Sequence, residues 1–190
     1  MPGISETTMT MHHTKLYTGY VNKMNEVAQR LEMLAKNPEA LDAGNQILSE
    51  HRSLRLADTF ATNGTYLHEI FFAGLGGDGV ATGELKTEIE NTWGSFEAWQ
   101  QLMVSCGLSV RGWAILAWDT HQGILRIFGG DAQNHGGVWG AIPLIAIDVY
   151  EHAYVIDHGA NRKAYLGAVF QNLDWEEANR RFASVRAWHT

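Results

Sequence analysis

Apolar residues recur with a helical period through the first part of the chain. Between residues 5 and 36 one stripe consists of Tyr20, Met24, Val27, Leu31 and Leu34. Ser5 precedes this stripe as a candidate N-cap, because its hydroxyl can accept a hydrogen bond from the first turn. Asn37 and Pro38 interrupt the pattern, since proline cannot continue a helix. The pattern predicts one long helix over residues 5–36.

A second helical pattern extends over residues 39–72, with a candidate interruption at Asn63 and Gly64. The glycine-rich segment 74–79 ends this pattern and is the best candidate for a linker. Two shorter helices, each opened by a hydroxyl residue suited to an N-cap, are predicted over residues 82–93 and 95–108.

The period changes to that of β-strands after Arg111. Two apolar stretches, 112–118 and 124–128, flank a turn-forming segment and predict a β-hairpin. A glycine-rich loop at 129–140 leads to a third predicted strand, 142–148. Two last helices are predicted over residues 160–173 and 175–187.

Together these elements predict an α+β protein of two domains. A helical N-terminal hairpin domain, residues 1–77, precedes a C-terminal domain, residues 78–190, in which helices flank a small three-stranded antiparallel sheet. At 190 residues the chain is long enough to bury a substantial core.

Composition and charge narrow the classes of function. The chain is 45% hydrophobic and 18% charged, values typical of a globular protein rather than a disordered or fibrous one. A formal net charge of −7, without a long cluster of Lys and Arg, argues against nucleic acid as a partner. No apolar run approaches the ~18 residues of a membrane span, so no membrane partner is expected. An anionic substrate would need local positive charge to attract it.

Cysteine content limits the possible sites further. Cys106 is the only cysteine, which excludes an intrachain disulfide and a cysteine-ligated zinc or iron–sulfur site. This usage fits a reducing compartment. The first residues do not show a basic segment followed by an apolar one, the pattern of a signal peptide. A cytoplasmic location is therefore expected.

The strongest chemical feature is a carboxylate and an imidazole four residues apart. Asp148 ends the third predicted strand, and His152 points the same way one turn later if the chain becomes helical there. Two such groups at the end of a buried strand need a partner, and a metal ion can supply it. His12 and His68, both on helical segments, are candidates for further ligands.

Each histidine also has a simpler explanation. His12 and His13 are adjacent, so at most one faces the core, and surface exposure explains such a pair. His68 lies in an aromatic-rich stretch, where a core histidine with a hydrogen-bond partner is the commoner case. If the three imidazoles and Asp148 converge, they make a site suited to manganese, iron or zinc rather than to calcium or magnesium.

Several motifs resemble those of the iron/manganese superoxide dismutases. The segment 11–15, Met-His-His-Thr-Lys, followed by 20–25, Tyr-Val-Asn-Lys-Met-Asn, is similar to the first-helix motif of that family. His68, which three residues separate from an Asn-Gly pair, resembles the second ligand. Residues 148–154 resemble the closing motif, with Tyr150 in place of the usual Trp. The likeness extends from about residue 4 to 182.

The resemblance implies an enzyme that converts two superoxide anions to O₂ and H₂O₂ by redox cycling of one manganese or iron ion. Zinc is excluded from that role because it has no accessible redox step. The implied metal ligands are His12, His68, Asp148 and His152.

Further roles follow from the same resemblance. Gln133 would bond the solvent that completes the metal's coordination, and Tyr20 would stand at the channel mouth and help to deliver protons. Trp113 and Tyr150 would wall the site, and Arg162 would attract the anion. Glu151 would reach the partner subunit's metal ligand, so a homodimer, or a tetramer built from it, is expected.

This chain departs from the family pattern in ways that bear on proton delivery. Leu16 and Tyr17 stand where many members have two histidines, and Val155 stands where they have a tyrosine. In those members the histidine and the tyrosine form a proton relay across the dimer interface. Phe72 and Ile115 replace two other aromatic wall positions.

By the same resemblance, the position of the amide that would bond the metal's solvent ligand favours manganese over iron. In iron-type members a Gln comes from the second helix, four residues before the second His ligand, whereas in manganese-type members it comes from the loop between the last two strands. Here Gly64 occupies the helix position and Gln133 the loop position.

Two other functions remain open at this stage. The chain can be a metal-binding protein of the same fold without dismutase turnover, although such a protein has no need to keep Tyr20, Gln133 and Arg162 together. It can also be a mononuclear non-haem iron oxygenase, whose metal is held by two His and one carboxylate. A third imidazole at the metal argues against that class.

Overall fold

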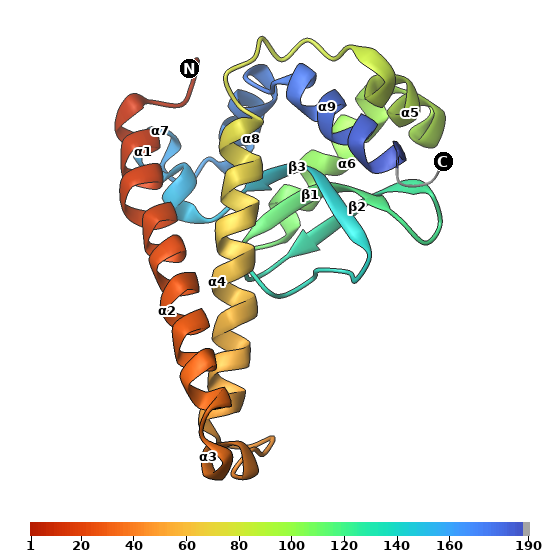
Figure 1. Ribbon diagram of the computed structural model, residues 1–190. Helices are drawn as coiled ribbons and strands as arrows, with labels where there is room; N and C mark the ends of the chain where they lie inside the picture. Colours follow the sequence, from red (N-terminus) through yellow and green to blue (C-terminus); the bar gives the residue numbers. More distant parts are fainter. Residues whose placement is uncertain (188–190) are drawn as a thin grey trace.

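A computed structural model describes residues 1–187, and its N-terminal part is a long helical hairpin (Figure 1). The first arm is one continuous helix whose parts are α1 (Glu6–Met11), a π-helical segment η1 (His12–Tyr17) and α2 (Thr18–Ala35). Ser5 caps it, because its side-chain oxygen accepts a hydrogen bond from the Thr8 amide at 3.1 Å. The predicted helix and its cap are confirmed, whereas the π segment was not predicted.

The second predicted helix is wrong at its start and at its interruption. A short helix, α3 (Pro38–Asp42), is followed by a loop, and the long arm α4 begins only at Glu50 (Glu50–Ala73). Asn45 stabilises this loop, because its side-chain oxygen accepts hydrogen bonds from the backbone amides of Ile47 and Leu48. Such local hydrogen bonds compete with those of a helix. At Gly64 the helix continues. A Cβ at this position would lie 2.6 Å from a ring carbon of Tyr20. This glycine serves helix packing rather than a break.

The glycine-rich segment after α4 breaks the helical pattern as predicted. It leads to two helices, α5 (Gly83–Trp93) and α6 (Phe96–Ser109). Ser95 caps α6 by accepting a hydrogen bond from the Ala98 amide at 3.1 Å. Thr82 makes no such bond, so that predicted cap is wrong; Asn179 Oδ1 accepts a hydrogen bond from Leu85, in the first turn of α5, at 2.9 Å instead.

The β-hairpin and third strand are confirmed as a three-stranded antiparallel sheet. Its strands are β1 (Trp113–Asp119), β2 (Ile124–Gly130) and β3 (Ala141–Asp148), in the order β2-β1-β3. Because β1 is central, Trp113 is paired with Gly130 on one side and Asp148 on the other. This register brings the wall residue Trp113 beside the candidate ligand Asp148.

The rest of the described chain is helical. After β3 follow a 3₁₀ turn η2 (Glu151–Ala153), α7 (Val155–His158), α8 (Arg162–Gln171) and α9 (Trp175–Arg186). The predicted α+β class is therefore confirmed. The boundary at residues 77/78 stays a prediction, and residues 188–190, the end of the second predicted domain, lie outside the described residues.

The two faces of β1 pack against different layers. Ala114, Leu116 and Trp118 join the main core with buried residues of α5, α6, α8 and α9. Trp113 and Ile115 point to the opposite face and pack with residues of α4. The face of β1 that carries Trp113 therefore packs against α4. Among the described helices, none is long and apolar enough to cross a membrane.

Candidate metal centre

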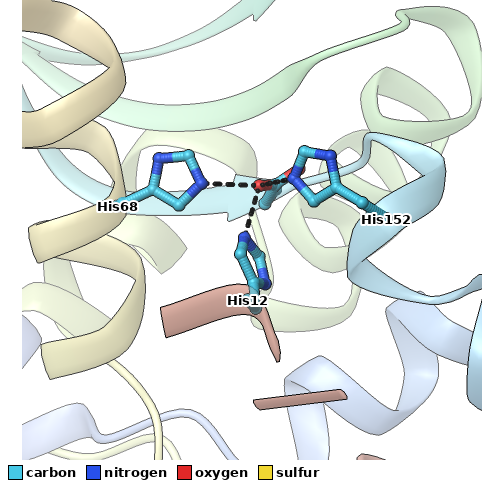
Figure 2. A group of neighbouring side chains, drawn as sticks. His12, His68 and His152 are labelled. Atoms are coloured by element: carbon cyan, nitrogen blue, oxygen red, sulfur yellow. Dashed lines mark hydrogen bonds and ion pairs between the residues drawn. The ribbon is translucent and has the colours of Figure 1, made fainter. Parts of the chain in front are cut away.

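Four side chains that are distant in sequence converge at the junction of the two layers. His12 comes from the first helix, His68 from α4, Asp148 from the end of β3 and His152 from η2. Figure 2 shows the three imidazoles pointing toward one carboxylate, which is that of Asp148 because all three Nε2 atoms lie within 3.3 Å of its Oδ2. One ligand atom from each residue lies within 4.8 Å of the other three. The structure thus brings together all four predicted metal-ligating residues.

The π segment explains how one helix provides both His12 and Tyr20. In a regular α-helix, residues eight positions apart differ by roughly 80° around the axis, whereas one extra residue in a π turn reduces this to roughly 20°. The Thr18 amide bonds to the His13 carbonyl five residues back, which is the π pattern. His12 and Tyr20 consequently face the same site.

Backbone hydrogen bonds fix the orientation of Asp148. Its Oδ1 accepts a hydrogen bond from the Tyr150 amide at 2.9 Å, and its carbonyl oxygen accepts one from the Tyr165 hydroxyl at 2.7 Å. Oδ2 is therefore directed at the imidazoles, whose Nε2 atoms lie at 3.1 Å for His12, 3.3 Å for His68 and 3.1 Å for His152.

The tautomer of His68 supports a metal cation at this point. Its Nδ1 lies 2.5 Å from the Gly64 carbonyl oxygen, which can only accept, so Nδ1 carries the proton. In the neutral ring, Nε2 then presents a lone pair to the carboxylate oxygen of Asp148. Two lone pairs repel unless a cation lies between them, and within residues 1–187 the buried Nε2 has no hydrogen-bond partner. The donor set thus fits a transition-metal ion.

The ionisation of two ligands favours cation binding. Burial lowers the pKa of His12, and this effect outweighs the opposing influence of Asp148, so the neutral ring is preferred. Burial raises the pKa of Asp148, but its hydrogen bonds with His12 and His152 hold that pKa well below its usual range. A neutral imidazole and an ionised carboxylate are the forms that bind a metal.

A chain of hydrogen bonds connects the wall of the site to Tyr20. The Trp113 indole donates to Gln133 Oε1 at 2.7 Å, and Gln133 Nε2 donates to the Tyr20 hydroxyl at 3.0 Å. Because an indole N–H can only donate, Trp113 determines which end of the amide faces Tyr20. Burial raises the pKa of Tyr20, so its hydroxyl keeps its proton at neutral pH.

Aromatic rings pack against the metal-ligating residues, and only His152 among the four is partly exposed. Trp113 lies edge-on to His68 at 5.1 Å between ring centroids, and Tyr150 stacks on His152 at 5.3 Å. Side chains of His12, His68 and Asp148 are at most 1% exposed, whereas that of His152 is 24% exposed. The site is therefore open to solvent on the side of His152.

Two other predicted residues lie beside the site rather than in it. The Arg162 guanidinium donates to the carbonyl oxygens of Gly107 and Val110, at the end of α6, and to the Tyr154 hydroxyl at 3.2 Å. Glu151 is exposed at the surface next to His152. Arg162 thus has a structural role that the sequence did not predict.

Sequence reasoning assigned no role to Tyr165, whose hydroxyl holds the Asp148 backbone, or to Phe71, whose ring lies 5.5 Å from that of His12. A fully buried tyrosine must find a partner for its hydroxyl, and this is the signal that points to Tyr165. Phe71 lies in an apolar stretch and carries no such signal.

Comparisons with known proteins match nearly the whole chain. Residues 1–76 match the family model described as the alpha-hairpin domain of iron/manganese superoxide dismutases. Residues 81–181 match the model of the C-terminal domain of the same enzymes.

Individual relatives carry the names of both metals. A protein of Aquifex aeolicus named superoxide dismutase [Fe] is 39% identical over 184 residues, covering 96% of this chain and 85% of the relative. One of Halobacterium salinarum, named superoxide dismutase [Mn] 1, is 35% identical over 185 residues, covering 95% of this chain and 88% of the relative.

Proposed function

The chain belongs to the iron/manganese superoxide dismutase family, and we propose that it disproportionates superoxide to O₂ and H₂O₂ at the centre formed by His12, His68, Asp148 and His152. The observation that carries this proposal is the convergence of three imidazoles and one carboxylate on a point where a cation is required. A manganese or iron ion bound there would supply the redox step by alternating between its +3 and +2 states. Superoxide decay catalysed by the metal-loaded chain tests the proposal.

The surrounding residues support proton handling at this centre. Each H₂O₂ formed needs two protons, and the bonds from Trp113 to Gln133 and from Gln133 to Tyr20 lead from the buried wall toward the half-buried Tyr20. Tyr20 can pass a proton inward by exchanging its hydroxyl hydrogen with solvent. The apolar side chains of Leu16 and Val155 cannot transfer a proton. This path therefore does not use the histidine–tyrosine relay that crosses the dimer interface in other family members.

The alternatives are weaker on the same observations. A non-haem iron oxygenase uses two His and one carboxylate, while three imidazoles converge here. A metal-binding protein without turnover would not need the Gln133 amide to be held between the Trp113 indole and the Tyr20 hydroxyl.

Manganese is the proposed ion, although relatives named for either metal are similar to this chain. A Cβ at Gly64 would lie 2.6 Å from Tyr20, so no glutamine fits on α4 while that ring keeps its position. Gln133 instead supplies the amide from the loop between β2 and β3. The presence of the amide on the loop rather than on α4, which is the manganese-type arrangement, thus has a steric explanation.

Replacing Tyr20 by phenylalanine is expected to slow proton-limited turnover. We expect kcat to fall about tenfold, with kcat/KM within about twofold, because capture of the first superoxide does not need the hydroxyl. Pulse radiolysis at high and low superoxide separates the two constants. Tyr66→Phe, at an exposed position of α4, is the matched control. Equal losses in both constants would show that Tyr20 does not act in proton delivery.

Arg162 is proposed to attract superoxide in a chain of negative net charge. Arg162→Ala should lower kcat/KM by about three- to tenfold and flatten its dependence on ionic strength. The lost bonds to Gly107 and Val110 should also lower Tm, so bound metal per folded chain is measured in parallel. Arg30→Ala, on the outer part of α2, serves as the control. An unchanged salt profile would leave Arg162 with its structural role alone.

A homodimer is proposed through the surface around Glu151. This exposed carboxylate lies next to the partly open His152. Val155 and Ile156, which follow four and five residues later and are each 48% exposed, add an apolar surface. Val155→Glu would place a charge in that interface and should raise the dissociation constant by more than roughly 100-fold. Sedimentation velocity measures this change, and Leu48→Glu, at the tip of the helical hairpin, is the control. A normal mass for Val155→Glu would reject this face.

The expected cytoplasmic location and the expected absence of nucleic-acid and membrane partners stay predictions.

A further inference from the structure

A cavity of about 650 Å³ lies between residues 56–67 of α4 and the sheet. It is open to solvent, and its volume is in the range of pockets that bind small molecules. Trp113 and Gln133 form its inner end, and none of the four metal ligands is among its lining residues. The cavity is therefore distinct from the metal centre, although the two share a wall.

Small side chains create this cavity. Further along α4, Phe71 packs against Trp113 of the sheet. Where the cavity lies, α4 contributes the short Thr59 and Asn63, and β1 contributes Ala117. Asn134 donates a hydrogen bond to the Thr59 hydroxyl at 2.9 Å and so ties the loop between β2 and β3 to α4. The loop is thus held in place while the space between helix and sheet stays unfilled.

One amide in the cavity wall is free to bind a ligand. Asn63 is partly buried, and within residues 1–187 its side chain makes no hydrogen bond. The other two amide side chains of the wall are engaged, because Gln133 is held by Trp113 and Tyr20, and Asn134 donates to α4. A primary amide presents an N–H donor and a C=O acceptor side by side. Asn63 can therefore pair with the edge of a molecule that carries an acceptor next to a donor.

Large aromatic side chains stand at both ends of the cavity. Trp113 lies at the inner end, and Trp139, which also lines the cavity, is 92% exposed, the highest value among the large hydrophobic residues described. Glycines at 136, 137 and 140 surround Trp139 in the chain and give its segment backbone freedom. An indole in water gains a large buried apolar area when it packs against a bound molecule. Flat rings are the shape that two such walls accept.

The charges around the cavity favour an uncharged ligand. Among the described lining residues none is Lys or Arg, and Asp58 is the only acidic one. Its carboxylate lies 3.5 Å from Arg55 Nη1, so its charge is already paired. An anion would find no positive partner in these walls, and a cation would find no unpaired negative one.

We propose that this cavity binds an uncharged, planar heteroaromatic molecule with an imide or lactam edge. The C=O and N–H groups of that edge pair with the Asn63 amide, the rings lie toward Trp113, and Trp139 covers their outer side. A polar group that loses its partner on binding opposes binding, so a molecule of the same shape without the edge should bind more weakly.

The test compares two three-ring molecules that are uncharged at neutral pH. Lumichrome carries an imide edge, and phenazine does not. Equilibrium dialysis against the metal-loaded full chain measures the dissociation constant of each. Lumichrome should bind with a Kd below roughly 100 µM, as expected for a ligand of its size, and phenazine at least roughly fivefold more weakly. The absence of saturable lumichrome binding in this range, or equal binding of phenazine, would overturn the proposal.

Asn63→Ala removes the amide and keeps a residue that favours the helix. It should weaken lumichrome binding by roughly tenfold and change phenazine binding by less than about twofold, because only lumichrome uses the amide. Asn91→Ala, which removes an exposed amide from α5, is the matched control and should bind both molecules like wild type. Unchanged lumichrome binding by Asn63→Ala, or equal losses for the two molecules, would reject the assigned edge contact and with it the proposal.

Trp139→Ser tests the aromatic wall at the rim. It should weaken binding of both molecules by a similar factor of roughly three- to tenfold, because stacking does not depend on the imide edge. Ile47→Ser removes another highly exposed apolar side chain, 87% exposed at the tip of the helical hairpin, and should have no effect. Wild-type affinities in Trp139→Ser would contradict the stacking that the proposal requires. Binding is measured without turnover, so a negative result leaves the proposed function standing.

Discussion

His152→Ala is expected to lose both the bound ion and superoxide turnover. It removes one of four ligand atoms and leaves Asp148 Oδ2 facing two imidazoles in a site opened further to water. Loss of an outer-sphere partner alone lowers metal affinity by about 10- to 100-fold, so loss of a ligand should cost more than roughly 100-fold. Metal analysis after dialysis and pulse radiolysis measure the two effects.

The control for this variant is His13→Ala. His13 is adjacent to a ligand on the same helix but exposed, so bound metal should be retained. Circular dichroism of both variants separates loss of metal from loss of fold. If His152→Ala keeps one ion per chain and full turnover, the ion is held elsewhere.

Manganese reconstitution is expected to give the active enzyme, and iron reconstitution an enzyme at least roughly tenfold slower. The reason is the position of Gln133, which Trp113 and Tyr20 fix on the loop side of the site. With a metal bound, such an amide would favour the oxidised state of the centre over the reduced state and so depress its reduction potential. Manganese needs this depression because its +3 state is the stronger oxidant, whereas iron would become too weak to oxidise superoxide.

Apoprotein loaded separately with each metal, at equal and measured occupancy, tests this preference. The reduction potential of each form provides a readout besides turnover, and it should be clearly lower for iron than for manganese. Full activity with iron and none with manganese would contradict the assignment while leaving the dismutase reaction intact.

The fold was predictable where local patterns dominate. The β-hairpin, the third strand and the caps at Ser5 and Ser95 follow from periodicity and short-range hydrogen bonding, and the structure has all of them. Two of the errors arise from tertiary packing. Gly64 looks like a helix break but provides space for the Tyr20 ring, and Asn179 from α9 takes over a bond expected of Thr82.

The site was predictable by a different route. The spacing of Asp148 and His152 pointed to a metal, but only the resemblance to a known family joined His12 and His68 to them. No local pattern encodes the π segment that turns His12 and Tyr20 to one face, or the bond from Tyr165 that holds Asp148. The bond from Tyr165 joins residues that are distant in sequence, which no local pattern can reveal.

The most direct measurement of the central claim is superoxide decay during titration of the apoprotein with manganese. The four-ligand centre predicts that the catalysed rate rises in proportion to added metal and reaches a plateau at one ion per chain. If the fully metal-loaded protein removed superoxide no faster than the apoprotein, this result would contradict the proposed four-ligand centre.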